Sequence, residues 1–566
     1  MVAGESGSWL LLEEHFESGD RRFLDELYGS TAEKKLQAFA PRWLKDRRPF
    51  AREMLLAYID DGCDRPHHRA LVKKLYKNTE DAKDDELLAH FLVSFDRLLG
   101  RKLVELRYYD WAERETKTRK ALISSGLPRS RHAADQEGRF TQVTRAYLIR
   151  RVFRRFRELA RRDGERYFAA AKQALLLYRD QHLSRPEQLL DAWSLVHICY
   201  HGSPVIARSP RGARLGGGRA LAELSPAPYA PALWRGRFEA VLDLFVRAPA
   251  RTVRVFALGW LEREYAADLG AIPLSRLLVL LKSPHDDVQL FAVRRLKDVS
   301  GLESLPIGQW LELLEIEHPI ALPILAELFE EHVAPSRLTL EECVRLARAP
   351  TAPVADLGLR WLRARKISGE PQIAQLLPIA EARTPSTRAE ASAWLVDLLR
   401  SAPAAKPEHL REVVDSRFAD AREAALPLLE QEGRYRDSPI LWAALAESPY
   451  DEIRTFLVRH LEERMSQFKD GSIQQVWAST LLSVHRGSRE KQRVLRQLAD
   501  RLIEGKDQVS TLAPLFRVAL RSVRPAERRH ALAAVGRAAF ERPSLRSALE
   551  QHFPELKLGA EDAVCR

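Results

Sequence analysis

Two stretches of the chain, Ser283–Leu296 (SPHDDVQLFAVRRL) and Ser448–Leu461 (SPYDEIRTFLVRHL), decide the fold. Each begins with a Ser-Pro turn that is followed by acidic residues and then by apolar residues at helical spacing. The apolar positions of the first stretch follow i, i+3, i+4 and i+8, at Val288, Phe291, Ala292 and Leu296. This spacing is typical of a helix that is buried on one side. Acidic residues at the start of such a helix cap free N–H groups and suit the helix dipole.

The same pattern recurs along the second half of the chain. Its anchor positions are Val253, Val288, Ile320, Val354, Arg388, Ala421, Ile453, Lys491 and Glu527. Successive anchors are 35, 32, 34, 34, 33, 32, 38 and 36 residues apart. A step of this length accommodates two helices and two short turns, which is one helical hairpin. One hairpin cannot bury its apolar stripe alone, so the copies are expected to stack.

The two quoted stretches resemble the second helix of HEAT or armadillo-type repeats, whose pattern is Asp-x-x-Val-Arg-x-x-Ala. The resemblance covers about residues 235–545, and it departs from the pattern at Gln289, where Arg is usual, and at Leu457, where a small residue is usual. It implies an all-α protein, a right-handed superhelical α-solenoid of HEAT-like hairpins. It implies little about function, because such solenoids serve many unrelated roles.

Three regions follow from the repeat and its interruptions. Residues 1–99 are predicted to form irregular helical hairpins, with helices over Thr31–Lys45 and Asp84–Leu99. Residues 100–232, where the repeat is lost, are predicted to be a basic helical insertion and a loop rich in Gly, Pro and Ser. Residues 233–566 are predicted to be the HEAT-like repeat array. Small residues within the copies are expected to let neighbouring helices approach closely; these are Ala257, Ala292, Gly358 and Ala425.

The composition is that of an ordinary globular protein. Of 566 residues, 45% are hydrophobic and 30% are charged, and no stretch approaches the apolar length that a membrane helix needs. The N-terminus lacks the basic segment of a signal peptide, and the four cysteines show no CxxC pair. We therefore expect a reduced, cytoplasmic setting and no membrane partner.

Positive charge is concentrated in one segment. Lys and Arg total 90 against 78 Asp and Glu, a net charge of +12, and most of the basic residues are arginines. This arginine bias is also typical of GC-rich, bacterial-type composition. Residues 101–172 contain 20 Lys and Arg against 9 Asp and Glu, a net charge of +11. The location of the charge is therefore more informative than its amount.

An arginine-rich amphipathic helix is predicted over residues 141–162 (TQVTRAYLIRRVFRRFRELARR). Its expected buried stripe consists of Leu148, Ile149, Val152, Phe153, Phe156 and Leu159. The candidate anion-binding or nucleic-acid-binding residues are Arg150, Arg151, Arg154, Arg155, Arg157, Arg161 and Arg162. Like charges so close together repel one another unless they are paired or screened.

Three interpretations of this helix stay open: a solvated helix whose arginines pair with neighbouring carboxylates, a nucleic-acid contact, and a contact with an acidic protein surface. Aromatic residues that are close in sequence favour the second interpretation, since they can stack on bases. They are Tyr108, Tyr109, Trp111 and Tyr147.

The other irregular segment, residues 200–232, is a candidate binding loop. Val205, Ile206, Leu215 and Leu221 are expected to form a small packed hairpin. Gly216-Gly217-Gly218 is interpreted as a flexible bend, because no Lys-Ser/Thr follows it and no strand precedes it. The nearby His197, Cys199 and His201 are expected on different faces of a helix, so we predict no metal site there.

No catalytic motif is recognisable: the sequence has no HExxH, GxSxG or Walker A string. We therefore expect no catalytic residues, no cofactor and no bound metal. The leading hypothesis is a non-catalytic scaffold or adaptor that binds another protein through its solenoid surface. The alternative is a nucleic-acid-binding solenoid that uses helix 141–162. A remote third is a nucleic-acid-acting enzyme of the helical-repeat type, of which the helical-repeat DNA glycosylases are one case. The oligomeric state is not indicated by the sequence.

Overall fold

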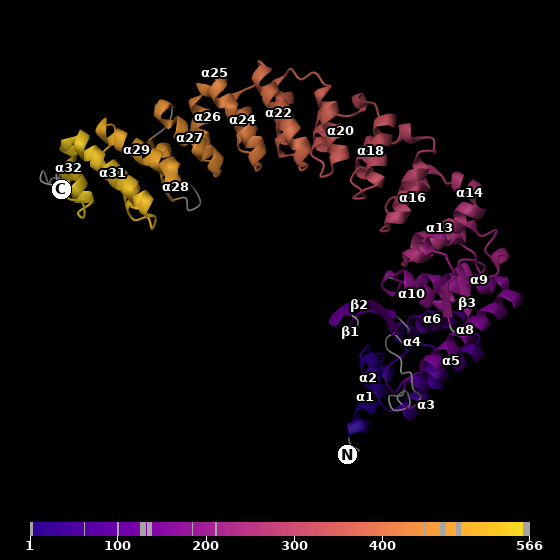
Figure 1. Cartoon of the computed structure of the whole chain (residues 1–566). Coiled ribbons are helices and arrows are strands. Elements are labelled where there is room, and N and C mark those ends of the chain that lie inside the picture. Colours follow the sequence, from indigo (N-terminus) through magenta and orange to yellow (C-terminus); the bar gives the residue numbers. More distant parts are fainter. Residues whose placement is uncertain are drawn as a thin grey trace. The chain divides into compact units, whose positions relative to one another are not determined.

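The computed structural model describes residues 4–558, except for 62, 99–100, 112, 125–131, 133–138, 184, 210–211, 447, 465–469 and 483–487. In this part of the chain helices dominate, and the strands form only two antiparallel hairpins (Figure 1). The prediction of an all-α protein is thus confirmed. None of the described helices combines the length and the apolar character needed to cross a membrane. The chain divides into two compact units, Met1–Ser300 and Gly301–Arg566.

The described residues of the first unit form fifteen α-helices and both strand hairpins. In chain order its elements are α1 (Gly4–Ser18), α2 (Phe23–Gly29), α3 (Glu33–Lys45), α4 (Pro49–Asp61), α5 (Arg69–Ala82), α6 (Asp85–Arg97), β1 (Arg101–Asp110), β2 (Glu115–Ser124), α8 (Gln142–Arg162), α9 (Gly164–Leu177), α10 (Pro186–Asp191), α11 (Trp193–Tyr200), β3 (Ile206–Ser209), β4 (Gly212–Leu215), α12 (Phe238–Arg247), α13 (Arg251–Glu264), α14 (Ala266–Gly270), α15 (Leu274–Leu280) and α16 (Asp286–Leu296).

The helices predicted near the N-terminus are confirmed. Helix α3 buries the expected stripe of Leu36, Phe39, Ala40 and Trp43. Helix α6 begins after Asp84, whose side chain caps it by accepting a hydrogen bond of 3.0 Å from the backbone N–H of Leu87. Such a cap satisfies one of the free donors of the first helical turn.

The region expected to be helical after residue 100 begins instead with a β-hairpin. Strands β1 and β2 pair in antiparallel register from Arg101↔Ser124 to Asp110↔Glu115. The helical prediction for these residues is wrong, because two extended runs pair here through inter-strand backbone hydrogen bonds in place of helical ones. The small hairpin expected near Val205 is confirmed: β3 pairs with β4, and Val205, Ile206 and Ala213 are buried.

The second unit is entirely helical in its described residues. Its α-helices are α17 (Ile307–Leu313), α18 (Ala321–His332), α19 (Leu340–Ala347), α20 (Ala352–Arg363), α21 (Glu370–Leu376), α22 (Pro385–Ser401), α23 (Pro407–Val414), α24 (Ala419–Gln431), α25 (Gly433–Arg436), α26 (Pro439–Ala446), α27 (Asp451–Arg464), α28 (Asp470–Leu482), α29 (Ser488–Ile503), α30 (Val509–Leu520), α31 (Pro525–Glu541) and α32 (Arg546–His552).

Helices of the second unit contact one another in a regular order. Within hairpins, α19 packs on α20, α23 on α24, α26 on α27, α28 on α29 and α30 on α31. The second helices of successive hairpins also touch, in the order α18, α20, α22, α24, α27, α29 and α31. These helices therefore pack on one another in chain order.

A buried guanidinium recurs at one position of the repeat and joins adjacent hairpins. Arg254 Nε lies 2.9 Å from both carboxylate oxygens of Asp287, and Arg254 Nη1 donates to the carbonyl of Ala248 at 2.9 Å. Arg388 makes the same contacts with Asp420 and Ala382. At the departure noted in the sequence, Gln289 Nε2 still donates to the carbonyl six residues earlier, that of Ser283, at 2.8 Å. Gln289 thus replaces the usual Arg but keeps the side-chain hydrogen bond to the carbonyl of the preceding turn.

The expected close approach at Gly358 is confirmed. A methyl group added at Gly358, on α20, would lie 2.7 Å from the backbone carbon of Leu346 at the end of α19. Ala257, Ala292 and Ala425 are likewise fully buried. The division at Ser300 falls inside the predicted repeat array, whereas the predicted boundaries at residues 99 and 232 stay predictions.

Candidate nucleic-acid interface

Helix α8 confirms the amphipathic helix predicted over residues 141–162. Thr141 caps its start by accepting a 3.1 Å hydrogen bond from the N–H of Thr144, and Asp163 ends it while capping α9. The six residues of the predicted stripe are all buried: Leu148, Ile149, Val152, Phe153, Phe156 and Leu159. Since this face packs inward, the arginines are forced toward the sides and the outer face of the helix.

Two of the seven candidate arginines form ion pairs. Arg151 donates to Glu80 of α5 from Nε at 3.0 Å and from Nη2 at 2.5 Å, and these hydrogen bonds raise the pKa of Arg151. Arg155 donates to Glu158, one turn further along the helix, at 3.1 Å. Arg150 also has an interaction partner. The interpretation of internal pairing therefore holds for part of the set.

Three other arginines, Arg154, Arg161 and Arg162, are exposed, and within the described residues none of them has an ion-pair partner. Seven residues make nearly two helical turns, so Arg154 and Arg161 point in directions that differ by only about 20°. The outer face of α8 thus carries positive charge that the described part of the chain does not neutralise.

Arg157 is half-buried, so it is less exposed than Arg154, Arg161 and Arg162. Its guanidinium carbon lies 6.0 Å from the centre of the Phe153 ring, and its Nε is buried without a hydrogen-bond partner among the described residues. A buried donor that lacks an acceptor costs about 1–3 kcal/mol of folding free energy. An anion that reaches this edge of α8 would remove that cost.

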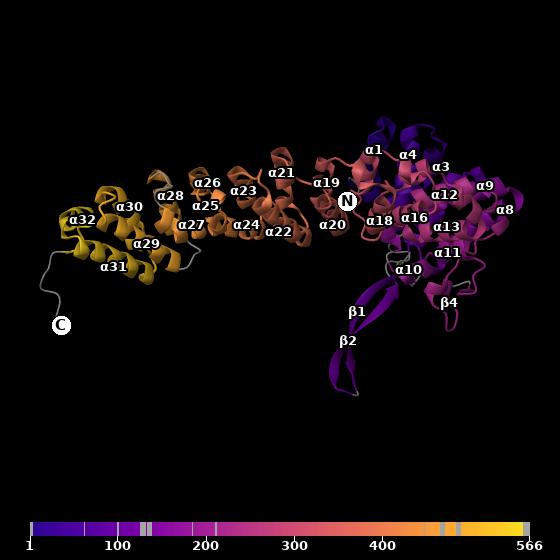
Figure 2. The same ribbon diagram turned by 90° about the horizontal axis from the view of Figure 1, so that it is seen from above.

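The aromatic residues noted in the sequence are exposed in the structure. Trp111 at the tip of the β1–β2 hairpin is 84% exposed, and its ring lies 4.9 Å from that of Tyr109 in an edge-on arrangement. Tyr108 is also exposed, as is Tyr147 on α8. In Figure 2 this hairpin extends beyond the helices that neighbour it. An apolar ring held in water is available for stacking on another flat group.

The charges at the hairpin tip are largely balanced. Lys117 Nζ lies 3.0 Å from Asp110, 2.5 Å from Glu113 and 3.8 Å from Glu115, and these hydrogen bonds raise the pKa of Lys117. The positive charge of Lys117 is therefore neutralised at a tip that also exposes aromatic rings. The rings are evident in the sequence, whereas the hairpin that presents them was not predicted. The available signal was the pair of residue runs favouring strands on either side of a polar turn.

The histidines near residue 200 lie together. His197 Nδ1 and His201 Nδ1 are 2.9 Å apart and hydrogen bonded, because residues four apart share a helix face. Our expectation that they lie on different faces is wrong for this pair, although Cys199 is buried elsewhere. Burial lowers the pKa of His197 to about 3 and that of His201 to about 4. Within the described residues no three His, Cys, Asp or Glu side chains gather in a way that would hold a metal ion.

Two glycines of the long loop, Gly216 and Gly218, shape the turn that follows the β3–β4 hairpin. The N–H of Gly216 donates to the carbonyl of Val205 at 2.9 Å, and Gly218 has a left-handed φ of +72°. Both features close and turn the chain after β4, in agreement with the predicted bend.

One buried carboxyl group, Asp96, has a strongly altered titration. Burial raises the pKa of Asp96 to about 6, although it accepts hydrogen bonds from Tyr178 and from the N–H groups of Ser194 and Leu195. The nearby Arg145 is also buried and donates to the carbonyls of Phe95 and Asp96. These contacts fix the start of α11 against α6, so the group has a structural role.

Comparison with known proteins finds neither a family model nor a curated protein that matches this chain.

Proposed function

We propose that the protein is a non-catalytic binding protein and that its first unit binds nucleic acid through the outer face of α8. The observation that carries this proposal is the set of three exposed arginines, Arg154, Arg161 and Arg162, for which the described residues supply no carboxylate. Phosphate groups provide the spaced negative charge that such a face attracts, largely without regard to base sequence.

The exposed rings of the β1–β2 hairpin support the same function. Tyr109 and Trp111 form a paired aromatic surface at the tip, and Tyr147 places a further ring on α8 itself. Stacking of a base on such a ring stabilises binding by about 1–3 kcal/mol and tolerates any base. Phosphate contacts at α8 and base stacking at the hairpin together favour single-stranded nucleic acid as the ligand.

The architecture that we propose is a right-handed superhelical α-solenoid of HEAT-like hairpins. The ordered contacts between successive hairpins and the recurring buried arginine support it. A reduced, cytoplasmic location is part of the proposal, and the three cysteines within the described residues, Cys63, Cys199 and Cys343, are buried and not disulfide-bonded.

Binding of a protein partner, the leading hypothesis from the sequence, is the second candidate function. A groove in the second unit, lined by Leu311, Val344 and Arg348 among others, favours it. Nothing in the described residues favours the enzymatic alternative, since the one carboxyl group with a strongly raised pKa, Asp96, is enclosed by protein groups.

The nucleic-acid proposal is tested by fluorescence anisotropy with labelled single-stranded DNA and RNA and with duplex DNA. The variant Arg154→Gln/Arg161→Gln/Arg162→Gln removes three positive charges from α8. We expect its affinity at 50 mM salt to fall by at least about tenfold and the slope of log K against log salt to decrease by about 2–3.

The matched control is Arg521→Gln/Arg528→Gln/Arg529→Gln, which removes the same charge from exposed arginines of the second unit. It should bind within about twofold of wild type. Equal losses in the two variants would show that net charge, not the face of α8, is responsible. Absence of binding by folded wild-type protein at low salt would overturn the proposal.

A further inference from the structure

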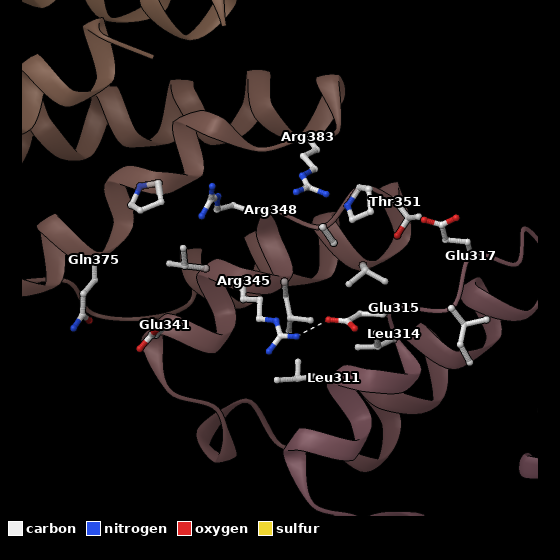
Figure 3. A pocket seen from close by; sticks show the side chains of 17 residues that line it. Leu311, Leu314, Glu315, Glu317, Glu341, Arg345, Arg348, Thr351, Gln375 and Arg383 are labelled. Atoms are coloured by element: carbon white, nitrogen blue, oxygen red, sulfur yellow. Dashed lines mark hydrogen bonds and ion pairs between the residues drawn. The ribbon is translucent and has the colours of Figure 1, made fainter. Parts of the chain in front are cut away.

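A groove in the second unit lies outside the proposed nucleic-acid interface. Its first part is a cavity of about 750 Å³ between α17, α19, α20 and α21 (Figure 3). Leu311, Leu314, Val344 and Val354 form an apolar lining. Ligand pockets usually have volumes of about 300–1,000 Å³ and an apolar lining with a few polar groups, so this cavity is large enough to hold side chains of a partner.

A second cavity of about 640 Å³ continues the first and shares Arg348 and Pro378 with it. Its lining extends along η6 (Leu377–Glu381) to α23, where Glu408, Glu412 and Asp415 lie. Because the two cavities share these residues, they are adjacent, and we refer to them together as the groove.

Some of the charges in this groove are already neutralised. Arg345 donates to Glu315 at 2.5 Å, the pair marked by a dashed line in Figure 3, and Glu381 accepts from Arg417 at 3.1 Å. His409 is buried and its Nδ1 accepts from the N–H of Lys406, which makes it part of the helix start. These groups therefore add little to the net charge that a ligand in the groove would meet.

The remaining charged side chains of the groove are exposed, and within the described residues they have no ion-pair partner. Five are carboxylates and two are guanidiniums: Glu317, Glu341, Glu408, Glu412 and Asp415, and Arg348 and Arg383. The groove is therefore acidic, with an excess of three negative charges, in a chain whose net charge is +12. Local charge of the opposite sign to the whole molecule favours a basic ligand at this place.

We infer that the groove binds a basic peptide segment of another protein, with apolar side chains in the cavities and Lys or Arg side chains against Glu408, Glu412 and Asp415. The apolar floor accounts for part of the affinity, and the acidic rim determines the charge of the partner. This site is independent of the proposed nucleic-acid interface, because all of its residues belong to the second unit.

The test uses the full chain and three labelled synthetic peptides of equal length. The first is an amphipathic Leu/Lys peptide, the second has the same composition in scrambled order, and the third carries Glu in place of Lys. We expect the first peptide to bind at least about tenfold more tightly than the other two. Equal binding of the scrambled peptide, or tighter binding of the acidic peptide, would overturn the inference.

Two variants locate the binding. Glu408→Gln/Glu412→Gln/Asp415→Asn removes the acidic rim, and Gln375→Trp places a large side chain at an exposed position that lines the first cavity. Each should weaken binding of the Leu/Lys peptide by about tenfold or more. The control Glu331→Gln/Glu423→Gln/Glu555→Gln changes the net charge of the same unit equally and should leave the affinity within about twofold of wild type. Wild-type affinity in both groove variants would overturn the inference.

Discussion

Arg388 illustrates how one side chain joins two hairpins of the second unit. Its guanidinium is almost fully enclosed, donating to Asp420 of the next helix and to the carbonyl of Ala382 in the preceding turn. The hydrogen bonds from Arg388 lower the pKa of Asp420. A buried charge of this kind is stable only while all its partners are present.

Arg388→Ala should therefore destabilise the second unit. It leaves a buried carbonyl without a donor and a partly buried carboxylate without its partner, at a cost of about 3 kcal/mol. Arg345→Ala removes an exposed ion pair with Glu315 and should cost less than about 1 kcal/mol. Chemical denaturation of the two variants measures the difference. Similar midpoints would contradict a structural role for the buried pair.

His197 makes stability depend on pH. Its pKa in the folded chain is about 3, lowered mainly by burial and next by the charge of His201, whereas an unfolded histidine titrates near 6.5. The unfolded chain thus binds the proton more tightly, so the contribution is complete above pH 6.5 and is lost as the pH falls toward 3. Between pH 7 and pH 5 this loss should lower the free energy of unfolding by about 2 kcal/mol. The unfolding free energy of His197→Phe should fall less over this interval than that of wild type; parallel curves would refute the assignment.

At the scale of helices, the sequence was most informative where one face of an element is buried. The predicted segment 141–162 differs from α8 by one residue, and all six stripe residues are buried, because a 3.6-residue period records which side packs inward. The repeat position that we assigned to Arg388 belongs one residue earlier in the chain. The residue equivalent to Val253 and Ala421 is Thr387, which is buried and donates to Asp356.

The β1–β2 hairpin was not predicted, although two strand-favouring runs on either side of a polar turn are a signal for it in the sequence. Its two strands, Arg101–Asp110 and Glu115–Ser124, are joined by an antiparallel backbone ladder. The pairing of Arg151 with Glu80 was beyond prediction, since the two residues are 71 positions apart. Such distant contacts determine which arginines remain unpaired. The sequence therefore identifies the seven candidates but does not separate the paired from the unpaired ones.

Gly358 provides a test of helix packing. Replacing Gly by Ala inside a helix normally stabilises it by about 1 kcal/mol. Here the added methyl group would meet the backbone of α19, 2.7 Å from the carbonyl carbon of Leu346, and backbone atoms cannot move aside at little cost. We expect Gly358→Ala to lower the stability of the second unit by about 1–3 kcal/mol. Gly308→Ala, where the new methyl group meets no atom within 4 Å, is the control, and thermal unfolding of both variants measures the effect. A higher melting temperature for Gly358→Ala would contradict the close approach.

For the whole molecule, the two candidate sites differ in the sign of their charge and lie in different compact units. The exposed arginines of α8 belong to the unit Met1–Ser300, and the acidic groove belongs to Gly301–Arg566. Binding at one site can therefore be abolished by substitutions that leave the other unit intact. The two proposals together predict a protein that binds a nucleic acid through its first unit and a basic protein segment through its second.

The most direct test of the central claim is the salt dependence of nucleic-acid binding by the wild-type protein. We predict binding to single-stranded DNA or RNA that weakens steeply between 50 and 200 mM salt, with a slope that decreases when Arg154, Arg161 and Arg162 are replaced by Gln. Binding that is absent at low salt, or that is unaffected by these three substitutions, would contradict the account of α8 as a nucleic-acid interface.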